Sequence, residues 1–378
     1  MLKKIIILSF FITYLNAYSQ SIPITEYSKN ELSENVIDGP HIEWIKENKV
    51  RLKYFIYDRE RNTAEILTRR RKVKDSLSII KGINTDPGRY MVEKKIEPQS
   101  SCFKDVDKIL MIGDIHGNMV KLLMILKNSG LIDDNGNWIW GEGHLVLIGD
   151  VFDKGERVTE ILWFIKLLQY QAEQAGGRVH LLYGNHEVMN LQSDFRYASL
   201  KYYFLSQNPG ISYSEIFNDD YELGRWLRSL KTITRINDIL FVHGGISPEV
   251  LDLKLSIPGL NQLMREYLDE PEDNPGDSLY YLLLGEKGPL WYRGYLMKTD
   301  NVDLISDQKV EETLEFYNAS RIVYGHTTDR KFRIGHDKRT ICIDVSHVKQ
   351  TDYGEQALLY KNGKFYKVLA DGTTALIF

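Results

Sequence analysis

The stretch Lys108–Gly117 reads KILMIGDIHG, an apolar run that ends abruptly in a glycine, an aspartate and a histidine. The same pattern of an apolar run followed by a polar motif recurs in HLVLIGDVFDKG at His144–Gly155 and in VHLLYGNHE at Val179–Glu187. Short apolar runs bounded by glycine are typical of buried strands. Helical periodicity fills the intervals at residues 118–128 and 159–175. The sequence therefore predicts an α/β sheet in which each strand ends in a polar motif.

Later apolar runs extend this pattern toward the C-terminus. They read ILFVHGG at residues 239–245, RIVYGHT at 321–327 and TICIDVSH at 340–347. Ligands of open α/β folds gather at the carboxyl ends of the strands, which is where these polar residues fall. We therefore expect the motifs to meet in one site.

The predicted strand ends supply carboxylate, imidazole and amide donors, namely Asp114, His116, Asp150, Asn185, His243 and His326. Such oxygen and nitrogen donors suit divalent manganese, iron or zinc, and they are too many for one tetrahedral site. Two metal ions that share a ligand fit the set better. Asp150 lies between the others in chain order and is the predicted bridging ligand. A histidine such as His243 taken alone is more often structural, so the prediction depends on the joint pattern.

The motifs GDIHG, GDVFDKG, GNHE, HGG and GHT, in this order, resemble those of the phosphoprotein phosphatase branch of the calcineurin-like metallophosphoesterases. The resemblance spans roughly residues 105–350. The stretch after GNHE, the QAGG at 174–177 and the LWYRGY at 290–295 are most similar to bacterial Shewanella-like phosphatases. The resemblance implies a four-layer α/β/β/α sandwich of two mixed sheets.

The resemblance also implies an allocation of the ligands to two divalent metal ions. Asp114, His116 and Asp150 would hold the first ion. The second would be held by Asp150, Asn185, His243 and His326. Manganese is the expected metal, with iron, zinc and nickel as alternatives, because the donor types alone do not choose among them.

A phosphomonoesterase mechanism follows from the same resemblance. A hydroxide bridging the two metals would attack phosphorus in line. His186 would act as general acid toward the leaving group, and Asp153 would orient its ring, although an aspartate at this position also suits a turn cap. Asn185, Lys154 and Arg293 would bind the phosphate oxygens.

The expected substrate is a protein or peptide phosphorylated on serine, threonine or tyrosine, or a small phosphoester. Lys154 departs from the pattern, because most relatives have arginine there and lysine offers a point charge in place of a planar fork. A similar lysine occurs in the diadenosine tetraphosphatase-like branch. A nucleotide or dinucleoside polyphosphate hydrolase is therefore the alternative function. A catalytically silent binding module is a third interpretation, which the complete ligand set disfavours.

The first residues resemble a secretory signal peptide. Lys3 and Lys4 precede an apolar run at residues 5–15, and Ala17 and Ser19 supply small residues for cleavage after Ser19. We expect an exported protein, periplasmic or secreted, without stable membrane insertion. An uncleaved N-terminal anchor is the alternative.

The chain of 378 residues divides into a signal peptide at 1–19, an N-terminal β-rich accessory segment with its linker at 20–98, and a catalytic domain at 99–378. A hairpin is predicted at 41–60 around a turn at 47–49, and a connecting loop at 84–101. The net charge of −4 gives no support for nucleic-acid binding, and the basic run at 69–72 is interpreted as a solvated face. No obligate protein partner is evident. Cys102 and Cys342 are equally compatible with a disulfide and with two thiols.

Overall fold

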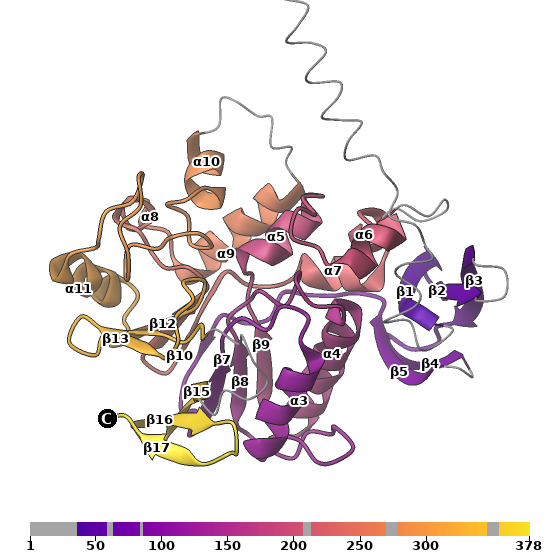
Figure 1. Ribbon diagram of the computed structural model, residues 1–378, viewed down its shortest axis with the longest axis horizontal. Helices are drawn as coiled ribbons and strands as arrows, with labels where there is room; N and C mark the ends of the chain where they lie inside the picture. The colour runs from indigo at the N-terminus through magenta and orange to yellow at the C-terminus, as the bar shows by residue number, and fades with distance from the viewer. Residues whose placement is uncertain (1–35, 59–62, 84–85, 207–212, 270–277, 346–354) are drawn as a thin grey trace, which may run out of the picture.

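Two six-stranded sheets form the centre of the molecule (Figure 1). The structure, a computed structural model, describes residues 36–378 except 59–62, 84–85, 207–212, 270–277 and 346–354. The first sheet has the order β17-β16-β15-β7-β8-β9, in which the three strands β7 to β9 are parallel. Its strands are β7 (Lys108–Ile112), β8 (His144–Leu147), β9 (Arg178–Leu181), β15 (Glu355–Lys361), β16 (Lys364–Leu369) and β17 (Thr374–Leu376).

The second sheet has the order β13-β14-β12-β11-β10-β6 and also mixes parallel with antiparallel pairs. Its strands are β6 (Cys102–Phe103), β10 (Ile233–Ile236), β11 (Ile239–Val242), β12 (Arg321–Tyr324), β13 (Arg333–Gly335) and β14 (Thr340–Cys342). The parallel strands β11, β12 and β14 place their carboxyl ends at one edge of the sheet. The apolar runs of the sequence are therefore strands, as predicted.

Alternation of side chains along each strand produces the layers. Ile109 and Met111 of β7 face inward and pack with Phe241 and Val323 of the second sheet in one apolar cluster. The residues between them face a larger cluster that includes the helices. Because each strand buries both faces, its sequence reads as a continuous apolar run. The four-layer α/β/β/α fold is confirmed.

Helices cover the outer faces of both sheets. The predicted helices at 118–128 and 159–175 are α3 (Met119–Asn128) and α4 (Val158–Gln174), beside β7 to β9 (Figure 1). Asn118 caps α3, because its side chain accepts a hydrogen bond from the Lys121 amide. The second sheet is accompanied by α8 (Pro248–Asp252), α9 (Ile257–Glu266) and α11 (Asp307–Phe316).

The N-terminal segment is β-rich, as expected. The predicted hairpin consists of β1 (Val36–Lys46) and β2 (Lys49–Asp58), to which β3 (Thr63–Lys72) adds a third strand. The expectation of a connecting loop at 84–101 is wrong for its first part. There β5 (Asp86–Glu93) pairs with β4 (Leu77–Ile83), so Pro87 and Gly88 lie in a strand. A two-stranded sheet has only edge strands, in which proline is tolerated.

Buried polar contacts join the N-terminal strands to the rest of the molecule. Trp163 of α4 donates to the Pro40 carbonyl at 2.9 Å. Glu222 at the start of α7 (Glu222–Leu227) accepts from the Trp44 indole at 2.6 Å, and the Lys166 ammonium lies 3.2 Å from Glu222. Lys166 also pairs with Glu93 of β5 at 2.6 Å. The N-terminal strands are thus held against α4 and α7 by charged groups as well as by apolar packing.

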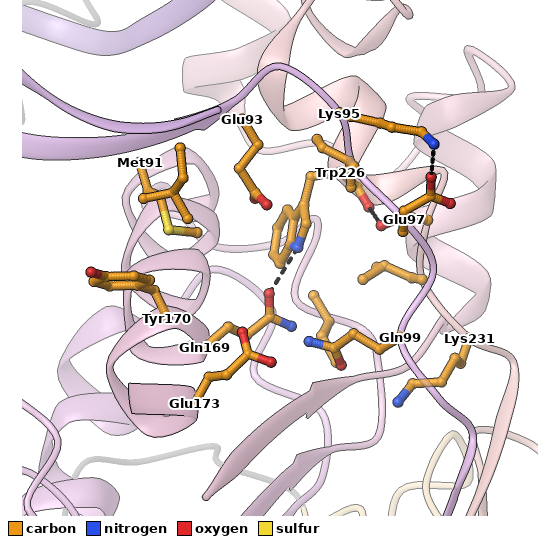
Figure 2. Close-up of a pocket in the computed structure, with 15 residues that line it drawn as sticks. Met91, Glu93, Lys95, Glu97, Gln99, Gln169, Tyr170, Glu173, Trp226 and Lys231 are labelled. Atoms are coloured by element: carbon orange, nitrogen blue, oxygen red, sulfur yellow. Dashed lines mark hydrogen bonds and ion pairs between the residues drawn. The ribbon is translucent and has the colours of Figure 1, made fainter. Parts of the chain in front are cut away.

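A cavity of about 380 Å³ lies at this junction. Figure 2 shows that Trp226 stands at its centre with the indole donating to Gln169, a bond of 2.9 Å, while Lys95 and Glu97 form an ion pair at 2.5 Å. Its lining comes mainly from β5, the linker after it, α4, α7 and the segment after α7, and includes none of the predicted site residues. The cavity is therefore separate from the predicted site residues.

Two further expectations concern the termini and the cysteines. The predicted signal peptide lies outside the described residues. Within the described part of the chain, no helix has the length and apolar character needed to cross a bilayer. Cys102 is exposed, Cys342 is buried, and both are free thiols, so the disulfide alternative is wrong for this structure.

Candidate active site

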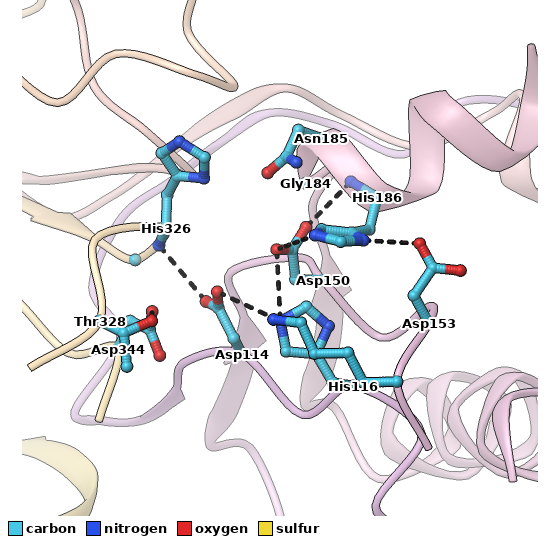
Figure 3. A network of polar contacts seen from close by, with 12 residues as sticks. Asp114, His116, Asp150, Asp153, Gly184, Asn185, His186, His326, Thr328 and Asp344 are labelled. Atoms are coloured by element: carbon cyan, nitrogen blue, oxygen red, sulfur yellow. Dashed lines mark hydrogen bonds and ion pairs between the residues drawn. The ribbon is translucent and has the colours of Figure 1, made fainter. Parts of the chain in front are cut away.

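Five of the six predicted metal donors lie close together in Figure 3, and the sixth, His243, contacts Asn185 and Asp150. Asp114 follows β7, Asp150 follows β8, and Asn185 begins α5 (Asn185–Leu191) after β9. His243 and His326 follow β11 and β12. All six therefore lie near the carboxyl ends of strands in the two sheets.

Two groups of donor atoms are close enough to hold a metal ion each. The first group is His116, Asp150 and His186, and the second is Asp150, His243 and His326, with the atoms of each group within 4.8 Å of one another. Asp150 belongs to both groups, which is the arrangement that a bridging carboxylate requires. Asp114 lies beside the first group, with a carboxylate oxygen 3.9 Å from His116 Nε2.

Several site residues have a left-handed backbone. The φ angle is 45° at His116, 52° at Asp150 and 63° at His326, and Asp153 and Lys154 follow with 68° and 60°. This conformation is unfavourable for residues that carry a Cβ, and it persists only where surrounding contacts hold it. The turns that aim the donors are therefore held by the rest of the structure.

The Glu187 carboxylate provides much of that support. It is fully buried and accepts the backbone N–H groups of Gly184 and Asp150 at 2.7 and 2.8 Å and of Val151 and Phe152 at 2.6 and 3.3 Å. A side chain at Gly149, whose φ is 98°, would overlap the backbone of Gly184. The turns after β8 and β9 are thus fastened to each other. The sequence analysis assigned Glu187 no role, although it is the last residue of the GNHE motif.

Backbone carbonyls fix the tautomers of two predicted ligands. Nδ1 of His243 lies 2.7 Å from the Ile148 carbonyl, and Nδ1 of His116 lies 2.8 Å from the Phe152 carbonyl. A carbonyl only accepts, so each Nδ1 carries a proton and donates. In the neutral rings the Nε2 lone pairs therefore point into the site, as metal ligation requires.

The buried acceptors and carboxylates at the centre of the site favour the binding of positive charge. Nε2 of His243 faces two acceptors, the Asn185 oxygen at 3.0 Å and an Asp150 oxygen at 3.3 Å. Although burial acts to lower it, the Asp150 carboxylate raises the pKa of His243 to about 10. Burial and the charges of Asp344 and Asp150 raise the pKa of Asp114. Among the described residues, the buried Nε2 of His326 has no hydrogen-bond partner. These features fit divalent metal ions held by the predicted ligands.

Asp344 and Lys121 are charged neighbours of Asp114 that the sequence analysis missed. Asp344, just after β14, is 3% exposed and accepts from the Thr328 hydroxyl at 2.5 Å. The buried Lys121 ammonium donates to the Asp114 carbonyl at 3.2 Å, and burial lowers the pKa of this lysine to about 7. An aspartate directly after the apolar run of TICIDVSH carried the same signal as the other strand-end donors.

The predicted general acid His186 lies between two aspartates. Its Nδ1 lies 2.6 Å from Asp153, whose second oxygen accepts from Asn190 at 3.0 Å, and its Nε2 lies 3.7 Å from Asp150 (Figure 3). Burial alone would lower the pKa of His186, but the hydrogen bond to Asp153 and the charges of both aspartates raise it. The raised pKa keeps the ring protonated to a higher pH. The ring of Tyr197 packs against His186 with centroids 5.2 Å apart and is 48% exposed.

The two predicted phosphate-binding cations approach from different sides. The Lys154 ammonium lies 2.7 Å from Nε2 of His116. Arg293 donates to the His326 carbonyl at 3.0 Å. A metal on His116 would take the lone pair that Lys154 contacts, which would leave the ammonium for a phosphate oxygen. The predicted site residues are thus all brought together around one centre.

Comparison with known proteins gives consistent matches. The family model described as calcineurin-like phosphoesterase matches residues 107–329. A Plasmodium berghei protein named Shewanella-like protein phosphatase 1 is 31% identical over 299 residues, which cover 74% of this chain and 81% of the relative. Shewanella-like protein phosphatase 2 of Arabidopsis thaliana is 37% identical over 128 residues, 34% of this chain and 31% of the relative.

A solved structure covers almost the whole described fold. The crystal structure described as a cold-active protein-tyrosine phosphatase of a psychrophilic Shewanella species is 32% identical, with a TM-score of 0.79. The match covers 90% of this chain and 99% of that chain. It therefore includes strands that precede the family-model region as well as the site.

Replacing Glu187 by glutamine tests the fastening of the two turns. The amide nitrogen would face N–H groups that need an acceptor, so we expect a loss of roughly 3 kcal/mol in the free energy of unfolding. Urea denaturation measures it. The control is Glu312→Gln, which weakens an exposed ion pair with Lys309 and is expected to leave the stability in urea nearly unchanged. Equal stability of the two variants would contradict the assigned role of Glu187.

Proposed function

Because this chain belongs to the calcineurin-like phosphoesterase family, we propose that it is a dinuclear phosphomonoesterase that acts on phosphorylated proteins. The observation that supports this proposal most strongly is the sharing of Asp150 by two donor groups, the first of which also includes His186 of the His186–Asp153 pair. Asp114, His116 and Asp150 would hold one ion, and Asp150, Asn185, His243 and His326 the other. Manganese is the proposed metal.

The chain's own residues account for the remaining parts of the reaction. When bound, two divalent cations acidify water and neutralise charge on the phosphate. Lys154 and Arg293 bind the phosphate oxygens from two sides, and the Asn185 amide adds a donor. His186 gives its Nε2 proton to the leaving oxygen, while the Asp153 carboxylate stabilises the charged ring and fixes its orientation.

Phosphotyrosine is the substrate that the surroundings of His186 favour within this class. The leaving group departs beside the general acid, and the half-exposed ring of Tyr197 lies against that residue. An aromatic leaving group can stack on such a surface, and an aryl pair contributes about 1 kcal/mol beyond area burial. The Shewanella structure described as a protein-tyrosine phosphatase is consistent with this choice.

A polyphosphate hydrolase is the second candidate, and the position of Lys154 favours it. Its exposed ammonium stands at the first donor group as a flexible point charge, which suits phosphates at more than one position along a chain. A silent binding module has less support, because no residue of the predicted ligand set is missing from the sequence.

We propose that the protein is exported, from the basic, apolar and small residues of its first 19 positions. N-terminal sequencing of the mature protein is expected to begin at Gln20. A start at Met1 would contradict export by cleavage.

Turnover of metal-loaded protein on three substrates tests the proposed function. We expect manganese-dependent hydrolysis of a phosphotyrosine peptide and of para-nitrophenyl phosphate. In His186→Asn, we expect turnover of the peptide to fall about 10²- to 10⁴-fold, with a smaller loss on para-nitrophenyl phosphate, whose leaving group needs little protonation.

The control for this test is His336→Asn, a histidine paired with Asp307 outside the site. A wild-type preference for diadenosine tetraphosphate over the peptide would replace the proposal by the polyphosphate hydrolase. No turnover of any of the three with any metal would favour the silent module.

The pH dependence of kcat tests the His186–Asp153 pair. His186 must be protonated to act as an acid, so activity falls as pH rises through its pKa. Asp153 raises that pKa, and Asp153→Asn therefore moves the alkaline limb toward lower pH. An unchanged alkaline limb would contradict the assignment of His186 as the acid.

A further inference from the structure

The turn Asp153–Gly155 carries two side chains of the proposed site, but its backbone conformation needs support from other parts of the structure. Asp153 orients His186, and Lys154 offers its ammonium to the substrate phosphate. Both residues are left-handed, with φ of 68° and 60°. Two consecutive residues of this kind, each with a Cβ, are in an unfavourable conformation and need external contacts to hold it.

Those contacts come from the segment that contains Tyr197 and α6 (Leu200–Ser206). The Lys154 amide donates to the Tyr197 carbonyl at 3.1 Å. Just beyond the turn, the Glu156 carbonyl accepts from the Lys201 ammonium at 2.7 Å and from the Tyr202 hydroxyl at 3.3 Å. The segment therefore holds the turn on both sides of Gly155.

The buried Lys201 ammonium needs a nearby negative charge to stay at the Glu156 carbonyl. Its side chain is 6% exposed, and burying an unpaired ammonium is strongly unfavourable. The partner is Asp38 of β1, fully buried, with one carboxylate oxygen 2.8 Å from the Lys201 ammonium. Glu160 is the other nearby carboxylate, at 3.8 Å and partly exposed. Asp38 thus supplies the close, buried countercharge.

Asp38 is itself held firmly. Its second oxygen accepts from the Thr159 hydroxyl at 3.0 Å and lies 2.8 Å from Nε2 of His41. Thr159 is the second residue of α4, directly after the turn, and its amide donates to the Tyr202 hydroxyl at 3.1 Å. Burial acts to raise the pKa of Asp38, but Lys201 and His41 together keep it below its usual range. The carboxylate therefore stays charged across the neutral range.

We infer that Asp38, in the N-terminal sheet, is a positioning residue of the active site that acts through Lys201 on the turn carrying Asp153 and Lys154. This inference rests on the proposed function, because its consequence is the placement of the groups that bind phosphate and protonate the leaving oxygen. Asp38 lies outside residues 107–329, which match the family model. The N-terminal strands are on this account part of the catalytic apparatus.

The structure offers a matched control in a second ion pair between the same two parts. Glu93 of β5 pairs with the fully buried Lys166 of α4 at 2.6 Å, next to the cavity shown in Figure 2. Both pairs join an N-terminal strand to a lysine of the catalytic part. Only the Asp38–Lys201 pair contacts the Asp153–Gly155 turn through a hydrogen bond to its flank.

The test compares Asp38→Asn, Lys201→Met, the double variant and Glu93→Gln in the full chain loaded with manganese. The measurements are kcat and KM on para-nitrophenyl phosphate, the inhibition constant of inorganic phosphate, and stability in urea. We expect Asp38→Asn to raise the inhibition constant of phosphate on the order of tenfold and to lower kcat/KM at least as much. Glu93→Gln is expected to be less stable in urea than the wild type, while its inhibition constant for phosphate stays within about twofold of the wild-type value.

The double variant separates a positioning role from general destabilisation. If Asp38 acts through Lys201, Asp38→Asn combined with Lys201→Met weakens phosphate binding no more than the stronger single variant. Additive losses, or the same weakening in Glu93→Gln, would overturn the inference. If Asp38→Asn does not fold, Lys201→Met with unchanged phosphate inhibition overturns it as well. A wild-type enzyme without turnover would instead refute the proposed function.

Discussion

The buried carboxylate of Glu187 is the interaction on which the rest of the site depends. Strand ends leave backbone N–H groups without partners, and burying such groups is costly unless an acceptor is supplied. Four of them, from the turns after β8 and β9, converge on this one side chain. The fully buried carboxylate in turn needs these four hydrogen bonds. They join the two turns that position Asp150, Asp153 and His186.

A second constraint is electrostatic and decides what the site can bind. Asp114, Asp150 and Asp344 are buried close together, and the carbonyls of Ile148 and Phe152 turn two imidazole lone pairs inward. Such a centre favours added positive charge, which divalent metal ions can supply. The His186 ring lies beside Asp150 on its Nε2 side and is paired with Asp153 on its Nδ1 side. This balance of charges suits a site that binds metal ions and phosphate.

Much of this was predictable from the sequence, because the information was local. Apolar runs ending in GD, GN, HGG or GH marked the strands, and the topology of an α/β sheet brings the ends of parallel strands to one edge. Two of the residues that sequence reasoning missed, Glu187 and Asp38, act over long range. The four donors that Glu187 binds include three that lie 35 to 37 positions away, and Asp38 meets Lys201 across the junction of two parts of the chain. Strand β5 was not predicted, because Pro87 and Gly88 usually mark loops. Both residues are tolerated in a two-stranded sheet.

The most direct test of the dinuclear site is the number of manganese ions that the purified protein binds. Calorimetric titration of metal-free protein, checked by elemental analysis after gel filtration, gives this number. Two ions per chain are expected in the wild type. In Asp150→Asn both binding events are expected to weaken, because in the proposed site both ions would use that carboxylate. A single binding event in the wild type, or loss of only one ion in Asp150→Asn with the other unaffected, would contradict a site built on a shared Asp150.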